Sequence, residues 1–210
     1  MTIVCWILVV LVGYFLGNLN GALLISRMLM KDDVRNHGSG NAGLTNFFRT
    51  YGGFQTFFVI GIDIIKCVLA CGWPMWFLPE EYGLFAGVVG GASCVFGHSF
   101  PVLEGFRGGK GILCGLAMAI ATDWRVAVLA LSIFIIVVLI TRYVSMGSIL
   151  AAAVFAASYG LFYTVIGPVY DWRIAVVGAA TGLFAAVRHH KNLGRLLRGT
   201  ESKLSFSKKK

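Results

Sequence analysis

Long apolar runs that carry almost no charge recur along the whole chain, and they limit what it can fold into. Hydrophobic residues make up 58% of the 210 positions and charged residues only 13%. A soluble domain of this size cannot bury that much apolar surface behind so little charge, whereas such runs are typical of helices that cross a membrane. No polar stretch is long enough for a separate soluble domain. The sequence therefore predicts an all-α integral membrane protein with a single domain over residues 1–210.

Seven candidate spans can be placed along the chain, at residues 3–25, 54–78, 83–96, 112–122, 126–141, 146–166 and 174–187. The fourth is the weakest, because a straight span needs about 20 apolar residues. Charge placement favours keeping it. With seven crossings and an external N-terminus, nearly all lysines and arginines fall on the cytoplasmic side, as the positive-inside rule expects. We therefore expect about seven transmembrane helices, an external N-terminus and a basic cytoplasmic tail over about residues 188–210.

The formal net charge of +9 does not call for a nucleic-acid partner. Basic cytoplasmic loops of a membrane protein account for it, so we expect no nucleic acid. The cysteines show neither a Cys-x-x-Cys pair nor a histidine at metal-ligand spacing. We expect free, buried thiols and no metal site. The cysteines in question are Cys5, Cys67, Cys71, Cys94 and Cys114.

The first polar motif reads Gly-Ser-Gly-Asn-Ala-Gly-Leu-Thr-Asn-Phe-Phe-Arg and follows the first span. It matches the dinucleotide pattern G-x-G-x-x-G, but no strand precedes it, so that interpretation fails. Backbone amides beside Ser39 and Asn41 can bind an anion, and Thr45 or Asn46 can cap a following helix. Arg49, one turn further, can hold a phosphate through two parallel hydrogen bonds. The alternative is an ordinary loop between helices.

The second motif lies at residues 97–111 and joins Gly-His-Ser-Phe-Pro to Gly-Gly-Lys-Gly. It is not a P-loop, because Glu104 and Gly111 stand where a Walker A loop needs glycine and serine or threonine. The glycines around Lys110 nevertheless offer bare amides and an ammonium to an anion at the start of a helix. The alternative is a lysine that reaches from an apolar helix to the membrane surface.

The third motif follows the last span. His189 and Asn192 are three residues apart and are expected on one face of a continuing helix. A histidine beside an amide can orient or deprotonate a hydroxyl. The alternative is a basic helix attracted to anionic lipid, which we favour for Arg195, Arg198 and the three lysines at 208–210. A short cytoplasmic turn at residues 142–148 adds two serine hydroxyls.

All three motifs fall on the same membrane face in the topology chosen from charge. Two anion-binding loops and a histidine–asparagine pair suggest a site for two phosphorylated groups at the cytoplasmic interface. Asp63 and Lys66 lie inside the second span, where ionised side chains are costly. Their i,i+3 spacing favours a structural pair.

In this order, the three motifs resemble those of the bacterial membrane-integral acyltransferases that transfer an acyl group from acyl phosphate to glycerol 3-phosphate. The matching segments are Gly-Ser-Gly-Asn…Thr-Asn…Arg at 38–49, Gly-His-x-Phe-Pro…Gly-Gly-Lys-Gly at 97–111, and His-x-x-Asn…Gly-Thr-Glu at 189–201. Arg-Tyr-Val-Ser at 142–145 also fits. The chain departs from the family at Cys67, where glycine is frequent, at Gly53, where lysine is frequent, and in its second histidine, His190.

The resemblance implies a seven-helix enzyme of the bacterial cytoplasmic (inner) membrane, with its active site facing the cytoplasm. Its partners would be acyl phosphate, glycerol 3-phosphate and membrane lipids, with no cofactor and no metal. Catalytic roles would fall to Lys110, His189 and Asn192, and a structural role to Glu201. Substrate-binding roles would fall to Ser39, Asn41, Thr45, Asn46, Arg49, Gly108, Gly109 and Ser148.

The chemistry of an acyl phosphate fits such a site. Its acyl group is already activated, so a protein mainly has to align two anions and screen their repulsion. Direct attack by the glycerol 3-phosphate hydroxyl is the simplest mechanism, with either His189 or a substrate phosphate oxygen as the base. The main alternative from another class is a membrane transporter for a phosphorylated small solute.

Overall fold

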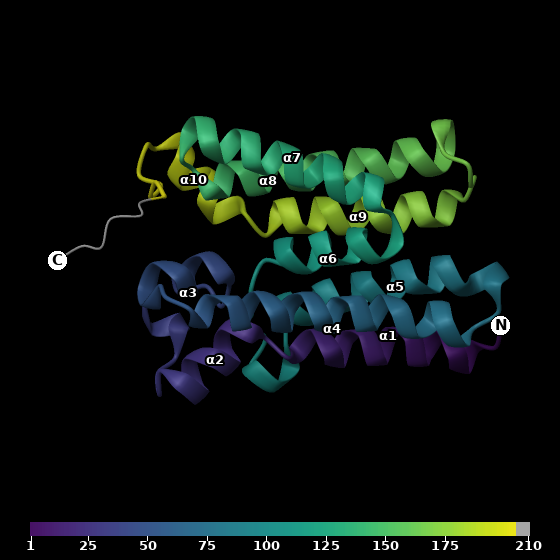
Figure 1. Ribbon diagram of the computed structural model, residues 1–210, viewed down its shortest axis with the longest axis horizontal. Helices are drawn as coiled ribbons and strands as arrows, with labels where there is room; N and C mark the ends of the chain where they lie inside the picture. The colour runs from purple at the N-terminus through teal and green to yellow at the C-terminus, as the bar shows by residue number, and fades with distance from the viewer. Residues whose placement is uncertain (205–210) are drawn as a thin grey trace. The chain divides into compact units, whose positions relative to one another are not determined.

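The computed structural model describes residues 1–204, and the regular elements of these residues are all helices (Figure 1). Two compact units divide the chain, Met1–Trp124 and Arg125–Lys210. We refer to them as the first and second units.

In the first unit, three long helices run side by side and a shorter one packs against two of them (Figure 1). Its helices are α1 (Ile3–Asn18), α2 (Gly21–Leu29), α3 (Leu44–Tyr51), α4 (Gln55–Phe77), α5 (Glu80–Ser99) and α6 (Ile112–Thr122). Two 3₁₀ turns, η1 (Val34–Asn36) and η2 (Val102–Glu104), stand in the loops after α2 and α5.

The second unit is built on an antiparallel pair of helices that pack closely together (Figure 1). Its elements are α7 (Trp124–Thr141, whose first residue closes the first unit), α8 (Val144–Leu161), the π-helical turn η3 (Phe162–Ile166), α9 (Trp172–Val187) and α10 (His190–Leu197).

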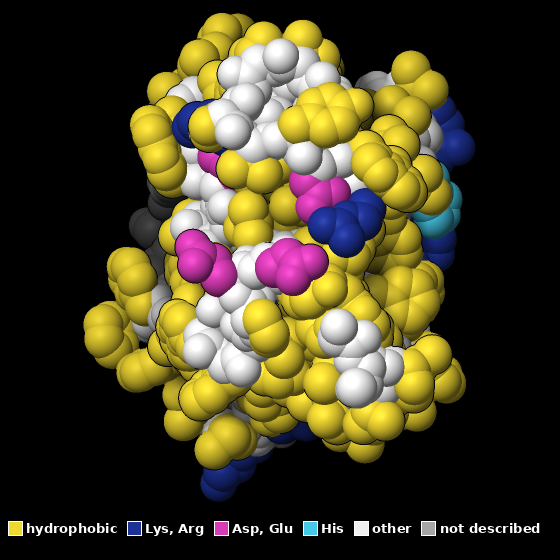
Figure 2. Space-filling model, turned by 90° about the vertical axis from the view of Figure 1, so that its right-hand side faces the viewer, with side chains coloured by type: hydrophobic (Ala, Val, Ile, Leu, Met, Phe, Trp, Pro, Cys, Tyr) yellow, Lys and Arg dark blue, Asp and Glu magenta, His cyan; other side chains and the backbone are white. Residues whose placement is uncertain are grey.

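Five helical segments of the described residues are long and apolar enough to cross a membrane. They are residues 3–29, 55–77, 80–104, 124–141 and 144–166. Many of their large side chains stay exposed: Leu139 and Ile140 in α7 are 75% and 77% accessible. Figure 2 looks onto helix ends instead, where acidic and basic side chains stand among the hydrophobic ones. The exposed apolar sides of the long helices suit lipid, and the multi-pass membrane architecture is confirmed.

The two remaining apolar helices are shorter. The helix α6 has 11 residues and α9 has 16, which correspond to about 16 and 24 Å at 1.5 Å per residue. The hydrocarbon core of a bilayer is about 30 Å thick. The segment 112–122, the weakest of the expected spans, is thus the shortest of the apolar helices.

The first expected span, 3–25, falls within the candidate span 3–29, but the helix is interrupted inside it. The helix α1 stops at Asn18, and Leu19 has a non-helical backbone with φ −72° and ψ 79°. The next helix begins at Gly21, where the side chain of Asn20 accepts a hydrogen bond from Leu23 N. This is an ordinary N-cap. The carbonyls released by the break are bound by Lys66 of α4.

Two other boundaries also differ from the expectation, and one helix ends in a π-helical turn. The helix α5 already begins at Glu80, so the acidic pair at 80–81 lies in its first turn, where the helix dipole favours negative charge. Ser145 and Ser148 lie inside α8 and not in a turn. The segment at 162–166 is a π-helix. The expected free cysteines are confirmed, although Cys5 is only partly buried.

Glycine permits the close contact between α1 and α5. A Cβ atom on Gly13 would collide with the carbonyl oxygen of Gly90, and one on Gly97 would collide with that of Tyr14. Small residues at such positions let helix backbones approach in a membrane, where no hydrophobic force drives helices together. By contrast, a Cβ on Gly61 in α4 would meet nothing within 4 Å.

We therefore expect Gly13→Ala to lower the melting temperature of the detergent-solubilised protein by several degrees, because overpacking a close contact costs about 1–3 kcal/mol. The matched change Gly61→Ala should leave it unchanged or raise it, because alanine favours a helix over glycine by about 1 kcal/mol. Thermal unfolding of both variants is the measurement. Equal effects of the two substitutions would contradict the packing role of Gly13.

Candidate active site

The first motif forms a compact loop that is held by the side chain of Asn46. Its Oδ1 accepts a hydrogen bond from Ser39 N at 3.0 Å, and its Nδ2 donates to the carbonyls of Val34 and His37, both at 3.0 Å. Gly38 and Gly40 have φ of +55° and +69°, a conformation that favours glycine. Asn46 is buried, and both of its amide hydrogens are used inside the loop.

The expected helix cap at Thr45 or Asn46 was wrong. The helix α3 begins at Leu44, and Gly43 occupies its N-cap position without a side-chain hydrogen bond. Both predicted residues therefore lie within the first turn of the helix. Asn46 does not cap the helix. The loop folds back over α3, and the side-chain amide of Asn46 forms hydrogen bonds with it instead.

Fewer amides of this loop face outward than the sequence suggests. The N–H groups of Ser39, Gly40 and Gly43 donate inside the chain. The side chains of Ser39 and Arg49 are nevertheless exposed, and that of Asn41 is half-buried. The loop thus offers side chains, more than backbone, to a ligand.

The second motif packs its glycines against the end of α5. Gly109 N donates to His98 O at 3.0 Å. A Cβ on Gly108 would collide with that same carbonyl, and one on Gly109 would collide with the His98 ring. Only glycine fits at both positions. Gly111 then adopts φ +83° as the N-cap of α6, so that the half-buried Lys110 stands just before the helix, as predicted.

The two motif loops adjoin each other within the first unit. A Cβ on Gly109 would lie 2.8 Å from the carbonyl oxygen of Ala42. That oxygen also accepts a hydrogen bond from Asn20 Nδ2 at 2.9 Å. Residues that are far apart in the sequence, around 42 and 109, are thus in contact, and the two loops pack against each other.

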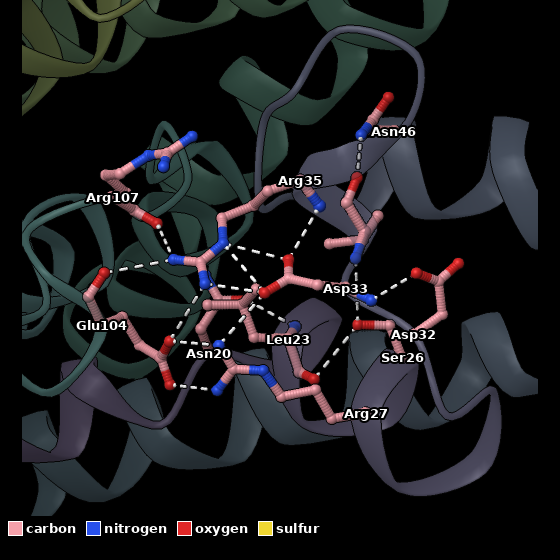
Figure 3. Close-up of polar contacts among 11 residues, drawn as sticks. Asn20, Leu23, Ser26, Arg27, Asp32, Asp33, Arg35, Asn46, Glu104 and Arg107 are labelled. Carbon is pink, nitrogen blue, oxygen red and sulfur yellow. Dashed lines mark hydrogen bonds and ion pairs between the residues drawn. The ribbon is translucent and has the colours of Figure 1, made fainter.

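An ion cluster ties together the outer parts of these loops (Figure 3). Arg27 donates to both oxygens of Glu104 at 2.7 Å and lies 3.1 Å from Asp33. Arg35 pairs with Asp33 at 2.7 Å and donates to the carbonyls of Glu104 and Arg107. The hydrogen bonds from Arg35 hold the pKa of Asp33 well below its usual range. Asp33 therefore stays ionised at neutral pH.

A second charged cluster is buried beneath the loops. Asp63 and Lys66 form the predicted i,i+3 pair, with 2.7 Å between Oδ1 and Nζ. His98 joins them, with its Nδ1 3.0 Å from Lys66 Nζ. Neither His98 nor Asn20 was expected from the sequence as a partner of this pair. The sequence signal that could have indicated them is that each is a polar residue in an otherwise apolar segment.

Three potential metal ligands meet in this cluster, although their spacing in the sequence gave no hint of it. The donor atoms of Asp63, His98 and Cys114 lie within 4.8 Å of one another. The ammonium of Lys66 contacts both Asp63 and His98. The positive charge that balances the carboxylate here is thus a lysine side chain.

The third motif does not continue the last long helix, and this expectation was wrong. The helix α9 ends at Val187, and His189 is the N-cap residue of the separate helix α10. The ring of His189 is buried, and its Nδ1 lies 2.8 Å from the carbonyl of Ala185. A carbonyl can only accept, so Nδ1 carries a proton. In the neutral ring, Nε2 is then the acceptor atom.

Glu201 anchors the third motif. It accepts a hydrogen bond from Asn192 Nδ2 at 3.0 Å and one from Arg195 Nε at 2.6 Å. Burial opposes ionisation of Glu201, but these bonds outweigh it and lower its pKa. Arg195 thus has a protein partner, besides any role at anionic lipid. His190 is exposed.

The remaining predicted residues are placed as follows. Thr45 is half-buried in α3. Ser148 is buried in α8, where its Oγ donates to the carbonyl of Val144 at 2.9 Å. The lysines expected at an anionic lipid surface, at 208–210, lie outside the described residues.

Comparison with known proteins gives a consistent result. A family model described as glycerol-3-phosphate acyltransferase matches residues 7–199. The glycerol-3-phosphate acyltransferase of Finegoldia magna is 39% identical over 197 residues, which cover 92% of this chain and 93% of that protein. The enzyme of the same name from Enterococcus faecalis is 35% identical over 204 residues, which cover 95% and 92%.

A solved structure agrees with these relatives. The crystal structure of PlsY (YgiH), an integral membrane glycerol 3-phosphate acyltransferase, in its glycerol 3-phosphate form, is similar with a TM-score of 0.83 and 30% identity over 96% of both chains. With a family model over most of its length and relatives above 30% identity across nearly all of it, this chain belongs to the glycerol-3-phosphate acyltransferase family.

Proposed function

We propose that this chain transfers a fatty acyl group from acyl phosphate to the 1-hydroxyl of glycerol 3-phosphate. The products are lysophosphatidic acid and phosphate, in phospholipid synthesis. The observation that carries the proposal is the likeness to PlsY across 96% of both chains, in the crystal structure of its glycerol 3-phosphate form. The crystal structure of its lysophosphatidic acid form is also similar, with a TM-score of 0.80 and 28% identity.

The proposed reaction is a direct transfer. The hydroxyl oxygen of glycerol 3-phosphate forms a bond to the acyl carbon, and the bond from that carbon to the phosphate oxygen breaks. The hydroxyl proton leaves to a base, and inorganic phosphate departs. Both reactants are anions, so alignment and charge neutralisation are the main tasks of the protein.

The loops of the first unit are proposed to bind phosphate. The exposed side chains of Ser39 and Arg49, with Asn41 and Thr45 beside them, supply hydrogen bonds and charge. Gly108 and Gly109 bring the backbone close, and Lys110 adds an ammonium before α6. Asn46 contributes by holding the loop in shape.

The third motif is proposed to hold glycerol 3-phosphate, with Ser148 as a further contact. The bond from His189 Nδ1 to Ala185 leaves Nε2 as the acceptor of the neutral ring, which suits a hydroxyl donor. Glu201 is proposed as structural because it fixes Asn192. We assign His189 mainly to orientation of the hydroxyl, since Asn192 cannot act as a base and yet would share that role.

The proposal also covers the membrane topology. The chain acts as one domain in the bacterial cytoplasmic membrane, with seven crossings, an external N-terminus, a cytoplasmic C-terminus and the reaction on the cytoplasmic side. It needs no cofactor and no metal. The distribution of lysine and arginine between the loops supports this orientation.

A donor competition assay tests the function. The purified protein in detergent is given glycerol 3-phosphate with acyl phosphate, acyl-CoA or acyl carrier protein bearing the same chain. We expect lysophosphatidic acid from acyl phosphate only. Product from acyl-CoA at an equal rate would contradict the proposed donor. A transporter of phosphorylated solutes would form no product at all.

Cysteine labelling tests the topology. On a background without the native cysteines, Glu80→Cys, Trp124→Cys and Tyr170→Cys are expected to react with an impermeant maleimide from outside. Arg107→Cys and Thr200→Cys should react only after the cytoplasmic side is opened. All five positions are exposed in their units. Labelling of 107 and 124 from the same side would show that α6 does not cross.

Removing a proposed phosphate ligand should leave a folded protein that is nearly inactive. A charge-assisted hydrogen bond contributes about 1.5–3 kcal/mol, which is about 10- to 150-fold in rate. We expect kcat/KM to fall by that range in Arg49→Ala and in Lys110→Ala. Arg49→Lys should also be impaired, because an ammonium cannot form two parallel bonds.

The control for lost charge is Arg198→Ala, an exposed residue at the end of α10. It should retain wild-type kinetics. A well-folded Lys110→Ala protein with wild-type turnover would refute the assignment of Lys110.

The third motif is tested by kinetics with both substrates varied. If His189 orients the hydroxyl, His189→Ala should raise KM for glycerol 3-phosphate far more than KM for acyl phosphate. If it is an obligatory base, kcat should instead fall by about 10²–10⁴ and one limb of the pH profile should disappear. The exposed neighbour provides the control, and His190→Ala should be mild. A severe defect in His190→Ala together with a silent His189→Ala would overturn the alignment of this motif.

A further inference from the structure

Four polar side chains are buried among the apolar helices of the first unit, directly beneath the two motif loops. Their accessible fractions are 1% for Asn20 and Asp63, 3% for Lys66 and 4% for His98. The acyl transfer described above assigns none of them a task. Ionised groups at such depth are costly, and they persist only where they are paired or do something that an apolar residue cannot.

Four acceptor atoms surround the ammonium of Lys66, which has three hydrogens to donate. It lies 2.7 Å from Leu19 O, 3.2 Å from Gly17 O, 2.7 Å from Asp63 Oδ1 and 3.0 Å from His98 Nδ1. The two carbonyls belong to the break between α1 and α2. Lys66 therefore fixes the backbone at that break and the ring of His98 at the same time.

The ring of His98 is oriented by this contact. An ammonium only donates, so Nδ1 accepts and the proton of the neutral ring sits on Nε2. The Nε2 side of the ring faces Gly109, where a Cβ would collide with it. The backbone carbonyl of the same residue accepts the hydrogen bond of Gly109 N at 3.0 Å. His98 thus supports the glycines before Lys110 through both ring and backbone.

Asn20 connects the buried polar side chains to the first motif loop. The Oδ1 of Asn20 caps α2 by accepting from Leu23 N, and its Nδ2 donates to Ala42 O at 2.9 Å. Asp63 completes the link, because its Oδ1 also accepts from Gly21 N at 3.1 Å. Asp63 and Lys66 therefore bind the backbone at the break between α1 and α2. Asn20, which lies in this break, binds the first motif loop.

We propose that Asp63, Lys66, His98 and Asn20 form a buried positioning network that sets both anion-binding loops relative to each other. This rests on the proposed function, in which those loops bind the substrate phosphates. The four are positioning residues, since they act through Ala42 and Gly109. In this proposal, the Asp63–Lys66 pair serves to fix the positions of the loops, and not to increase the free energy of unfolding.

The test uses three variants of the detergent-solubilised full chain. His98→Asn keeps an acceptor near the place of Nδ1 but removes the ring from Gly109. Asn20→Ser keeps a favourable capping residue but is too short to reach Ala42. Asp63→Asn with Lys66→Met removes both charges together, so that no buried charge is left alone, and retains the acceptor for Gly21 N. Cys71→Ala, a buried change in α4 whose thiol contacts Cys67 and not either loop, is the control.

The first readout is hydrogen exchange of backbone amides, followed by mass spectrometry of peptides. We expect exchange to quicken about tenfold or more over residues 104–112 in His98→Asn, over 38–46 in Asn20→Ser, and over both in the double variant. Exchange in the middle of α4 and α5 should stay as in the wild type. Cys71→Ala should lower the melting temperature without loosening either loop.

The second readout is kinetic. Each network variant should lose about tenfold in kcat/KM, whereas Cys71→Ala, despite its lower melting temperature, should not. Unchanged exchange in both loops of all three network variants would overturn the proposal, and so would equal loosening in Cys71→Ala. If the wild type forms no lysophosphatidic acid, the proposed function fails, but the exchange pattern still decides whether the network holds the loops.

Discussion

The first unit depends on one buried ammonium. Lys66 Nζ gathers a carboxylate, an imidazole nitrogen and two backbone carbonyls from three helices. In an apolar interior each of these groups would be costly to leave without a partner. Together they satisfy one another, and the break between α1 and α2 becomes possible because its carbonyls have a donor. The same contact orients His98, and through it the glycines ahead of Lys110.

Around this contact, glycine residues determine how closely neighbouring backbones approach each other. Gly13 and Gly97 allow the backbones of α1 and α5 to touch, while Gly108 and Gly109 allow the second motif to lie on the end of α5. The ion cluster of Arg27, Asp33, Arg35 and Glu104 closes the outer side of the same loops (Figure 3). Buried polar links, glycine contacts and surface ion pairs thus act on one set of loops from three directions.

The sequence predicts most of the architecture because lipid imposes long apolar runs, and their charge-free length can be read directly. It also predicts the Asp63–Lys66 pair, since i,i+3 neighbours share a helix face. It fails where a partner comes from elsewhere in the chain. Nothing local shows that Lys66 will bind the carbonyls at Leu19, or that Asn46 will serve a loop and not a helix end. Likewise, the helix α9 ends before His189, and no glycine or proline at that point predicts the end.

The short helix α6 has a consequence for the bilayer itself. Its 11 residues cover about half of the hydrocarbon thickness. If this segment crosses, the backbone of residues 106–111 has to descend below the headgroups as irregular chain. Such a chain is tolerated in lipid only where protein surrounds it, and Gly108, Gly109 and Gly111 are indeed buried. The hydrophobic mismatch would then draw the lipid surface down toward this loop, so that an amphiphile could leave its tail in the membrane while its headgroup reaches Lys110.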